Sequence, residues 1–187
     1  MNKEHLVYCA SPEWEETVRK YVVPGSTAGK ELGDHLLEVG PGPGLTTNVL
    51  ATMVPRLTAV ELDEELAAAL TERFAGTHVS IHRGDATRTP FADGTFSAAI
   101  CLTMLHHLPT PEDQDRLFAE LNRVVTKGGV VIGNDSLDSP EFRGFHHDDI
   151  CTPVDPATLE RRLRAAGLTD IEVSVNPFSV TFSGRAS

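Results

Sequence analysis

Residues 36–44 have the sequence LLEVGPGPG, in which an apolar run leads directly into three glycines at alternating positions. Glycine adopts backbone conformations that other residues avoid, so this spacing predicts a tight turn whose main chain can approach a ligand closely. Apolar residues at helical spacing follow at Leu45–Val54. The stretch therefore predicts a buried strand, a glycine-rich turn and a helix whose N-terminus carries partial positive charge.

Similar apolar runs recur along the chain and are typical of strands buried on both faces. The predicted strands are His35–Val39, Leu57–Leu62, His78–His82, Phe96–Leu102 and Val130–Gly133. The predicted helices between them are Leu45–Val54, Glu64–Phe74 and Pro111–Thr126. Strands that alternate with helices form right-handed βαβ units, so we expect an α/β fold with a doubly wound, mostly parallel sheet.

The two ends of the chain depart from this alternation. After a predicted helix at Pro156–Ala166, two apolar runs at Ile171–Val175 and Phe178–Phe182 flank a turn, which predicts a terminal antiparallel β-hairpin. Near the N-terminus, Pro12–Val22 predicts a helix that covers the ligand cleft, and Pro24–Gly33 predicts a linker. We expect one domain over residues 1–187, with residues 1–33 as the cover helix and linker.

Carboxylates follow two of the predicted strands. Glu61 ends the second strand about twenty residues beyond the glycine turn, where a carboxylate can accept hydrogen bonds from ribose hydroxyls. Asp63 is expected to cap the next helix. Asp85 follows the third strand and could accept a hydrogen bond from an adenine amine, although a simple Asp turn would also explain it. Because the carboxyl ends of parallel strands meet at one edge, these residues predict a nucleotide site there.

Together these residues resemble the class I S-adenosylmethionine-dependent methyltransferases, of the small-molecule type that includes quinone-biosynthesis enzymes. The resemblance covers about residues 34–182 and includes a further stretch, LNRVVTKGG at residues 121–129. The family usually has Lys-Pro-Gly-Gly there, so this chain lacks the proline. The resemblance implies a Rossmann-like methyltransferase fold with a seven-stranded sheet. It also implies methyl transfer from S-adenosyl-L-methionine, with S-adenosyl-L-homocysteine as product.

The resemblance also implies the residues of the site. The cofactor-binding residues would be Glu38, Gly40, Pro41, Gly42, Gly44, Glu61, Leu62, Asp85, Ala86 and Thr103. His106 and His107 follow the fourth strand, where a histidine could act as general base on an acceptor hydroxyl. The alternative is that these histidines only pack against or cap the following loop.

Residues 135–155 show no clear periodicity and predict a long loop that could line the acceptor pocket. The loop contains His146, His147, Asp148 and Asp149. Neighbouring residues seldom point at one ion, so we expect no metal site.

Composition limits the partners. The net charge of −11 disfavours nucleic acid, because nucleic-acid binding depends on Lys and Arg that neutralise phosphates. No run approaches the roughly 20 apolar residues of a membrane span, and the three cysteines show no disulfide or metal spacing. We expect a cytoplasmic enzyme that acts on a small molecule, whose acceptor atom (oxygen, nitrogen, sulfur or carbon) stays open, as does the oligomeric state.

Two other functions fit parts of the pattern. A nicotinamide-dependent oxidoreductase would use the same turn and Glu61, but its fingerprint requires Gly or Ala where this chain has Leu45. A module that binds the cofactor without turnover would keep the same residues.

Overall fold

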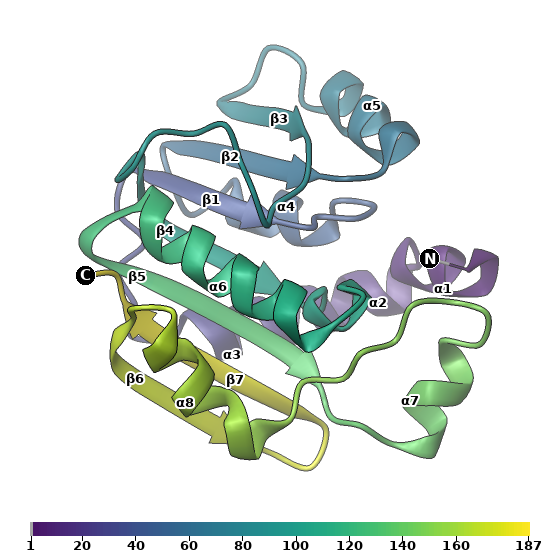
Figure 1. Cartoon of the computed structure of the whole chain (residues 1–187). Helices are drawn as coiled ribbons and strands as arrows, with labels where there is room; N and C mark the ends of the chain where they lie inside the picture. Colours follow the sequence, from purple (N-terminus) through teal and green to yellow (C-terminus); the bar gives the residue numbers. More distant parts are fainter. Residues whose placement is uncertain (1) are drawn as a thin grey trace.

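The computed structural model describes residues 2–187 and contains a seven-stranded sheet in the order β3-β2-β1-β4-β5-β7-β6 (Figure 1). The strands are β1 His35–Val39, β2 Arg56–Glu61, β3 Val79–Arg83, β4 Phe96–Leu102, β5 Val125–Ser136, β6 Thr169–Val175 and β7 Ser179–Arg185. Strands β1 to β5 are parallel, and β7 pairs antiparallel with both β5 and β6. The predicted parallel sheet and terminal hairpin are confirmed.

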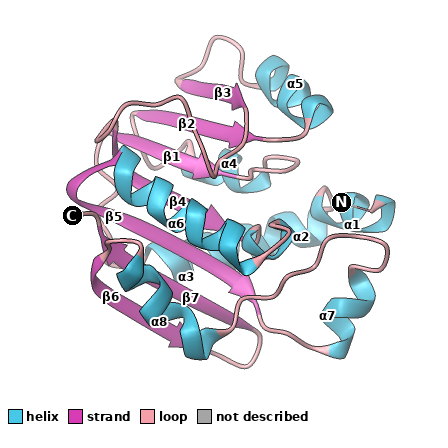
Figure 2. Ribbon diagram, viewed as in Figure 1, coloured by secondary structure: helices cyan, strands magenta, loops and turns pink. Residues whose placement is uncertain are grey.

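Helices cover both faces of the sheet (Figure 2). They are α1 Lys3–Cys9, α2 Pro12–Thr17, α3 Val23–Thr27, α4 Leu45–Leu50, α5 Glu64–Arg73, α6 Pro111–Val124, α7 Pro140–Phe145 and α8 Pro156–Ala165, with a π-helix η1 at Val18–Val22 and a 3-10 turn η2 at Leu105–His107. None of the helices in residues 2–187 is both long and apolar enough to cross a membrane.

Alternating side chains of the central strands divide the core in two. On β4, Ala99 and Cys101 pack in the cluster that contains the buried residues of α6 and α8. Ala98 and Ile100 pack in the cluster that contains residues of η1, α3 and α4. Because successive side chains of a strand point to opposite faces, a run of apolar residues serves both clusters.

The structure corrects the prediction for the N-terminal region and for residues 135–155. The predicted linker Pro24–Gly33 begins inside α3, which continues the chain of helices from α2 through η1. Pro24 lacks a backbone N–H and its ring displaces the carbonyl four residues earlier, which accounts for the wider π turn before it. Helix α1 was not predicted, the helix expected at Leu45–Val54 ends at Leu50, and the long loop contains α7.

Candidate active site

The glycine turn lies between β1 and α4, where the sequence predicted it. Gly40, Gly42 and Gly44 all have positive φ angles, of 64°, 53° and 81°. Side chains with a Cβ are strained in this region, so the turn requires glycine at these three positions. The turn opens toward the carboxyl edge of the sheet.

Arg73, at the C-terminal end of α5, stabilises the glycine turn by hydrogen bonds to its carbonyl oxygens. Its guanidinium donates hydrogen bonds to the carbonyls of Pro43 and Gly44 at 3.0 and 2.9 Å. A Cβ on Gly44 would lie 2.0 Å from the Arg73 guanidinium and 2.4 Å from the Leu70 side chain. Gly44 therefore allows close packing of the turn against α5. Sequence reasoning missed Arg73, since its only signal is a cation in the last turn of a helix.

Glu61 closes the turn from the neighbouring strand. One carboxylate oxygen accepts the Gly42 N–H at 2.9 Å, and the other accepts the Asp63 N–H at 3.0 Å. The side chain is buried. Asp63 caps α5 as predicted, accepting the Leu66 N–H at 3.0 Å. The Glu61 carboxylate is thus held in one orientation before any ligand arrives.

Asp85 follows β3 and is exposed. One carboxylate oxygen accepts hydrogen bonds from both the backbone N–H and the hydroxyl of Thr87, at 2.8 and 2.7 Å. Asp85, which forms this Asp turn, also lines a cavity at the carboxyl edge of the sheet. The other oxygen remains as a possible acceptor for a ligand.

A cavity of about 500 Å³ lies at this edge of the sheet and brings most of the predicted residues together. Its lining includes Gly40, Pro41, Gly42, Glu61, Leu62, Asp85, Ala86 and Thr103, and also His107. His5, Cys9 and Trp14 of the N-terminal helices line it too. Of the residues in the predicted cover helix Pro12–Val22, Trp14 lines this cavity, whereas His5 and Cys9 belong to α1.

Glu38 and Gly44, both predicted to bind the cofactor, do not line this cavity. The Glu38 side chain is buried beside α4, where the Thr46 hydroxyl donates to it. Burial raises the pKa of Glu38 to about 7. The cavity wall at the glycine turn is formed by main chain. Glu38 and Gly44 support this main chain and do not face the cavity.

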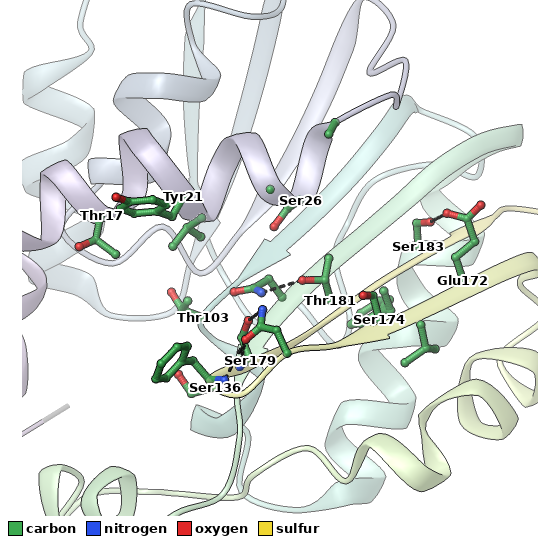
Figure 3. A pocket seen from close by; sticks show the side chains of 18 of the residues that line it. Thr17, Tyr21, Ser26, Thr103, Ser136, Glu172, Ser174, Ser179, Thr181 and Ser183 are labelled. Carbon is green, nitrogen blue, oxygen red and sulfur yellow. Dashed lines mark hydrogen bonds between the residues drawn. The ribbon is translucent and has the colours of Figure 1, made fainter.

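Thr103 lines this cavity and also a second one. It has a φ of 51°, a conformation that strains a β-branched residue, and its N–H donates to the Asn134 carbonyl at 2.7 Å. The second cavity has a volume of about 910 Å³ and lies between the N-terminal helices and strands β5 to β7 (Figure 3). Thr103 and Trp14 line both cavities.

His106 and His107 lie in the η2 turn after β4, in different environments. His106 is buried, and its Nδ1 lies 2.7 Å from a carboxylate oxygen of Asp135. His107 lines the first cavity. His5 and His146 come from α1 and the end of α7 and pack against them, with ring centroids 4.2 to 6.2 Å apart. The sequence predicted neither Asp135 nor His5 as part of the site.

The pKa values of His5, His107 and His146 are lowered. Burial is the largest cause, and neighbouring imidazoles add to it, so the pKa is about 4 for His5 and about 2 for His107. Burial also lowers the pKa of His146. A general base works best with a pKa near the working pH, so His107 is poorly suited to that role at neutral pH.

Comparison with known families identifies the chain. The profile of a family described as a methyltransferase domain matches residues 37–133. The chain belongs to this methyltransferase family. The matched region contains the glycine turn, Glu61, Asp85 and η2.

Among proteins of known function, the methyltransferase is similar to ribosomal RNA small subunit methyltransferase A. It is 31% identical over 102 residues to that protein from Acidithiobacillus ferrooxidans, which covers 54% of this chain and 36% of the relative. The corresponding protein of Methylococcus capsulatus is 44% identical over 64 residues, covering 34% of this chain and 25% of the relative. The methyltransferase thus spans about a third or less of the length of these relatives.

Solved structures show the same fold. A chain from the complex between the Haloferax volcanii Trm112 methyltransferase activator and a methyltransferase superposes with a TM-score of 0.74 at 14% identity, covering 100% of this chain and 99% of that chain. Phosphoethanolamine N-methyltransferase 2 of Haemonchus contortus, solved with S-adenosylmethionine, superposes with a TM-score of 0.72 at 14% identity, covering 94% of this chain and 52% of that one.

Proposed function

We propose that this methyltransferase transfers the methyl group of S-adenosylmethionine to a small-molecule acceptor held in the larger cavity. The observation that carries the proposal is that the cavities of about 500 and 910 Å³ share Thr103 and Trp14. Two reactants in adjoining cavities can be held in line, which is what methyl transfer requires. Small-molecule sites typically have volumes of about 300–1,000 Å³, a range that includes both cavities.

The smaller cavity has the donor and acceptor set that the cofactor requires. Each Glu61 oxygen accepts one backbone N–H and keeps a lone pair for a ribose hydroxyl. The second oxygen of Asp85 would accept the adenine amine. The main chain of Gly40–Gly42 and residues 102–104 would pack along the methionine part. In this assignment Leu62 and Ala86 supply apolar contacts to the ribose and adenine.

The chemistry makes few demands on the protein. When bound, the sulfonium of the cofactor is already an activated methyl donor. The chain therefore has to align the acceptor with the methyl group and exclude water, and alignment alone can lower a barrier by about 7–11 kcal/mol at best. The fixed turn, with Glu61 held by two main-chain donors, serves this purpose because it orients the cofactor before the acceptor binds.

The larger cavity combines an apolar wall, which includes Trp14 and Phe178, with several polar side chains. Hydroxyl side chains of Thr17, Ser26, Ser136, Ser174 and Thr181 line it, together with the amide of Asn134. In Figure 3 these side chains approach the space from the helix on one side and from the strands on the other. Hydroxyls both donate and accept hydrogen bonds, so they suit a ligand that carries hydroxyl, amide or phosphate groups.

The relatives named ribosomal RNA methyltransferases raise RNA as a second acceptor class. Their match covers about a third of their length or less, so most of each relative has no counterpart in the match. The net charge of −11 argues against RNA, since phosphate contacts provide most of the affinity in such complexes. The small-molecule acceptor is therefore our proposal, and RNA is an outcome of the test.

The test has two stages. Calorimetric titration with S-adenosylhomocysteine, beside NAD(H) and NADP(H), is expected to give micromolar binding of the first alone. Methyl transfer from labelled S-adenosylmethionine is then measured with fractionated small metabolites and with ribosomal RNA. Label in the RNA alone would overturn the proposed acceptor. Tight cofactor binding with no transfer to any acceptor would favour the module without turnover.

Once an acceptor is found, a pair of neighbouring variants tests the cavity assignment. Ser174→Trp fills the larger cavity from β6, whereas Val175→Trp places the same ring on the opposite face of that strand, outside the cavity. We expect Ser174→Trp to raise KM for the acceptor at least tenfold without changing affinity for S-adenosylhomocysteine, and Val175→Trp to change neither. Equal KM values in both variants would place the acceptor elsewhere.

A further inference from the structure

Four imidazoles from three distant segments meet beside the cofactor cavity. His5 lies on α1, His106 and His107 lie in η2, and His146 follows α7. One ring nitrogen from each lies within 4.8 Å of the corresponding nitrogens of the other three. Because these segments are far apart in sequence, the tertiary fold rather than a local turn brings the nitrogens together.

Two of these rings have a buried nitrogen without a partner. His106 and His146 are 3% and 4% exposed, and the Nε2 atom of each has no hydrogen-bond partner among residues 2–187. A buried polar atom that is left unpaired destabilises the folded state. Two such atoms within one cluster of imidazoles indicate that the cluster binds a ligand that pairs with these nitrogens.

The protonation of both rings follows from their partners. The Nδ1 of His146 lies 2.7 Å from the Phe142 carbonyl oxygen, and the Nδ1 of His106 lies 2.7 Å from Asp135. A carbonyl oxygen and a carboxylate accept hydrogen bonds, so each Nδ1 carries a hydrogen, and the neutral form of each ring presents its lone pair at Nε2. Neither Nε2 can donate to the other. A lone pair at a buried, unpartnered Nε2 is stabilised by a cation.

Asp135 supplies the support that metal-bound histidines need. It is completely buried, and its two oxygens accept from the His106 ring and from the His106 backbone N–H, at 2.7 and 3.0 Å. Ligating histidines usually donate their second ring nitrogen to a carboxylate or a carbonyl, which fixes the tautomer and makes the ligand more basic. The second ring nitrogen of His106 faces the Asp135 carboxylate, and that of His146 faces the Phe142 carbonyl. A buried carboxylate also gains a favourable charge partner when a cation binds to the ring beside it.

We propose that His5, His106, His107 and His146 bind one divalent transition-metal ion, with zinc as the preferred ion. Four imidazole nitrogens match the tetrahedral coordination of zinc, in which Zn–N distances of about 2.0–2.1 Å place the ligand nitrogens about 3.4 Å apart. Magnesium and calcium prefer oxygen ligands, so this site discriminates against them.

The ion would cross-link α1 and the end of α7 to η2, next to the cofactor cavity. His5 and His107 both line that cavity, and each segment contributes at least one ligand. A nitrogen that binds a cation has no lone pair left to accept a proton. The metal site therefore assigns His106 and His107 to ligation in place of general-base catalysis. It does not depend on the identity of the methyl acceptor.

Metal binding by the purified chain tests this directly. The protein is stripped with a chelator, dialysed and titrated calorimetrically with Zn²⁺, and metal content is measured by mass spectrometry. We expect one Zn²⁺ per chain, and with Co²⁺ the visible absorption of a four-coordinate, nitrogen-ligated ion. Failure of the wild-type chain to bind either ion at micromolar concentration would overturn the proposal, and this result does not depend on any variant or on methyl transfer.

Matched variants test the ligand set. His146→Ala is expected to weaken Zn²⁺ binding at least about 100-fold, and Asp135→Asn about 10- to 100-fold, the range typical of outer partners. His147→Ala is the control, because His147 is adjacent and exposed but lies outside the cluster. Circular dichroism and the Co²⁺ spectrum of each variant separate loss of a ligand from loss of the fold. An equal loss in His147→Ala, or none in a folded His146→Ala, would contradict the assignment.

Discussion

The carboxyl edge of β1 to β3 and the histidine cluster under α1 and α7 both border the same cavity, but they are built differently. At the sheet edge, each functional group lies a few residues from the glycine turn or from a strand end, and neighbouring main chain holds it. In the cluster, His5 meets His146 across most of the chain. The first region depends on local backbone geometry and the second on tertiary packing.

The largest effect is expected at Glu61. Glu61→Ala removes the proposed acceptor for two ribose hydroxyls and also releases the Gly42 N–H that Glu61 holds at 2.9 Å. Hydrogen bonds to a charged group are worth about 1.5–3 kcal/mol each, so affinity for S-adenosylhomocysteine should fall at least about 100-fold. Calorimetry measures it, with exposed Glu65→Ala as the control. Because Glu61 is buried, some loss of thermal stability should accompany the change. Unchanged affinity in a folded variant would remove Glu61 from the site.

The same contrast explains what the sequence could predict. The glycine turn, Glu61 and the Asp63 cap follow from strand-turn-helix patterns within about thirty residues, and the parallel pairing of the strands follows from their alternation with helices. Arg73 supports the turn from the far end of α5, and no local pattern distinguishes it from a surface cation. In the sequence, His146 stands beside His147, Asp148 and Asp149, and none of these three belongs to its cluster. Its actual partners lie on α1 and η2, and a single sequence without the fold could not place them together.

Glu38 should make stability depend on pH. Its folded-state pKa is raised from 4.5 to about 7, with burial as the first cause, so the folded protein holds this proton more tightly than the unfolded chain. The resulting stability is fully present below pH 4.5 and is lost as pH rises through 7, about 3 kcal/mol in all. In Glu38→Gln, the side chain at this position no longer ionises.

We therefore expect the Gln variant to gain stability relative to the wild type as pH increases from 4.5 to 8. Urea unfolding across this range at fixed ionic strength measures the difference in free energy between the two proteins. A difference that stays constant with pH would show that the Glu38 carboxylate is not the titrating group.

A pair of glycine substitutions compares the rigidity of the two regions. Gly44→Ala imposes a left-handed φ of 81° on alanine and brings its Cβ against Arg73 and Leu70, so we expect a loss of about 2 kcal/mol. Gly144→Ala, in α7, meets nothing within 4 Å and should gain about 0.5–1 kcal/mol from helix propensity. Thermal unfolding should show Tm lowered by about 4–8 °C in the first and raised slightly in the second. A loss in both variants would mean that α7 is as tightly constrained as the turn.

The smallest effect is expected at Asp85, where only one carboxylate oxygen is available to a ligand. The other oxygen accepts from Thr87 twice, so in Asp85→Asn the amide oxygen would keep those bonds and the amide nitrogen would face the cavity. A donor would then oppose the adenine amine, which is also a donor, and affinity for S-adenosylhomocysteine should fall about 5- to 10-fold, or about 1 kcal/mol. S-inosylhomocysteine carries an acceptor oxygen in place of that amine, so the variant should bind it better than the wild type does. Calorimetric titration of both proteins with both ligands measures this exchange of preference. If the two ligands lose affinity equally in the variant, Asp85 orders the turn after β3 but does not contact the base.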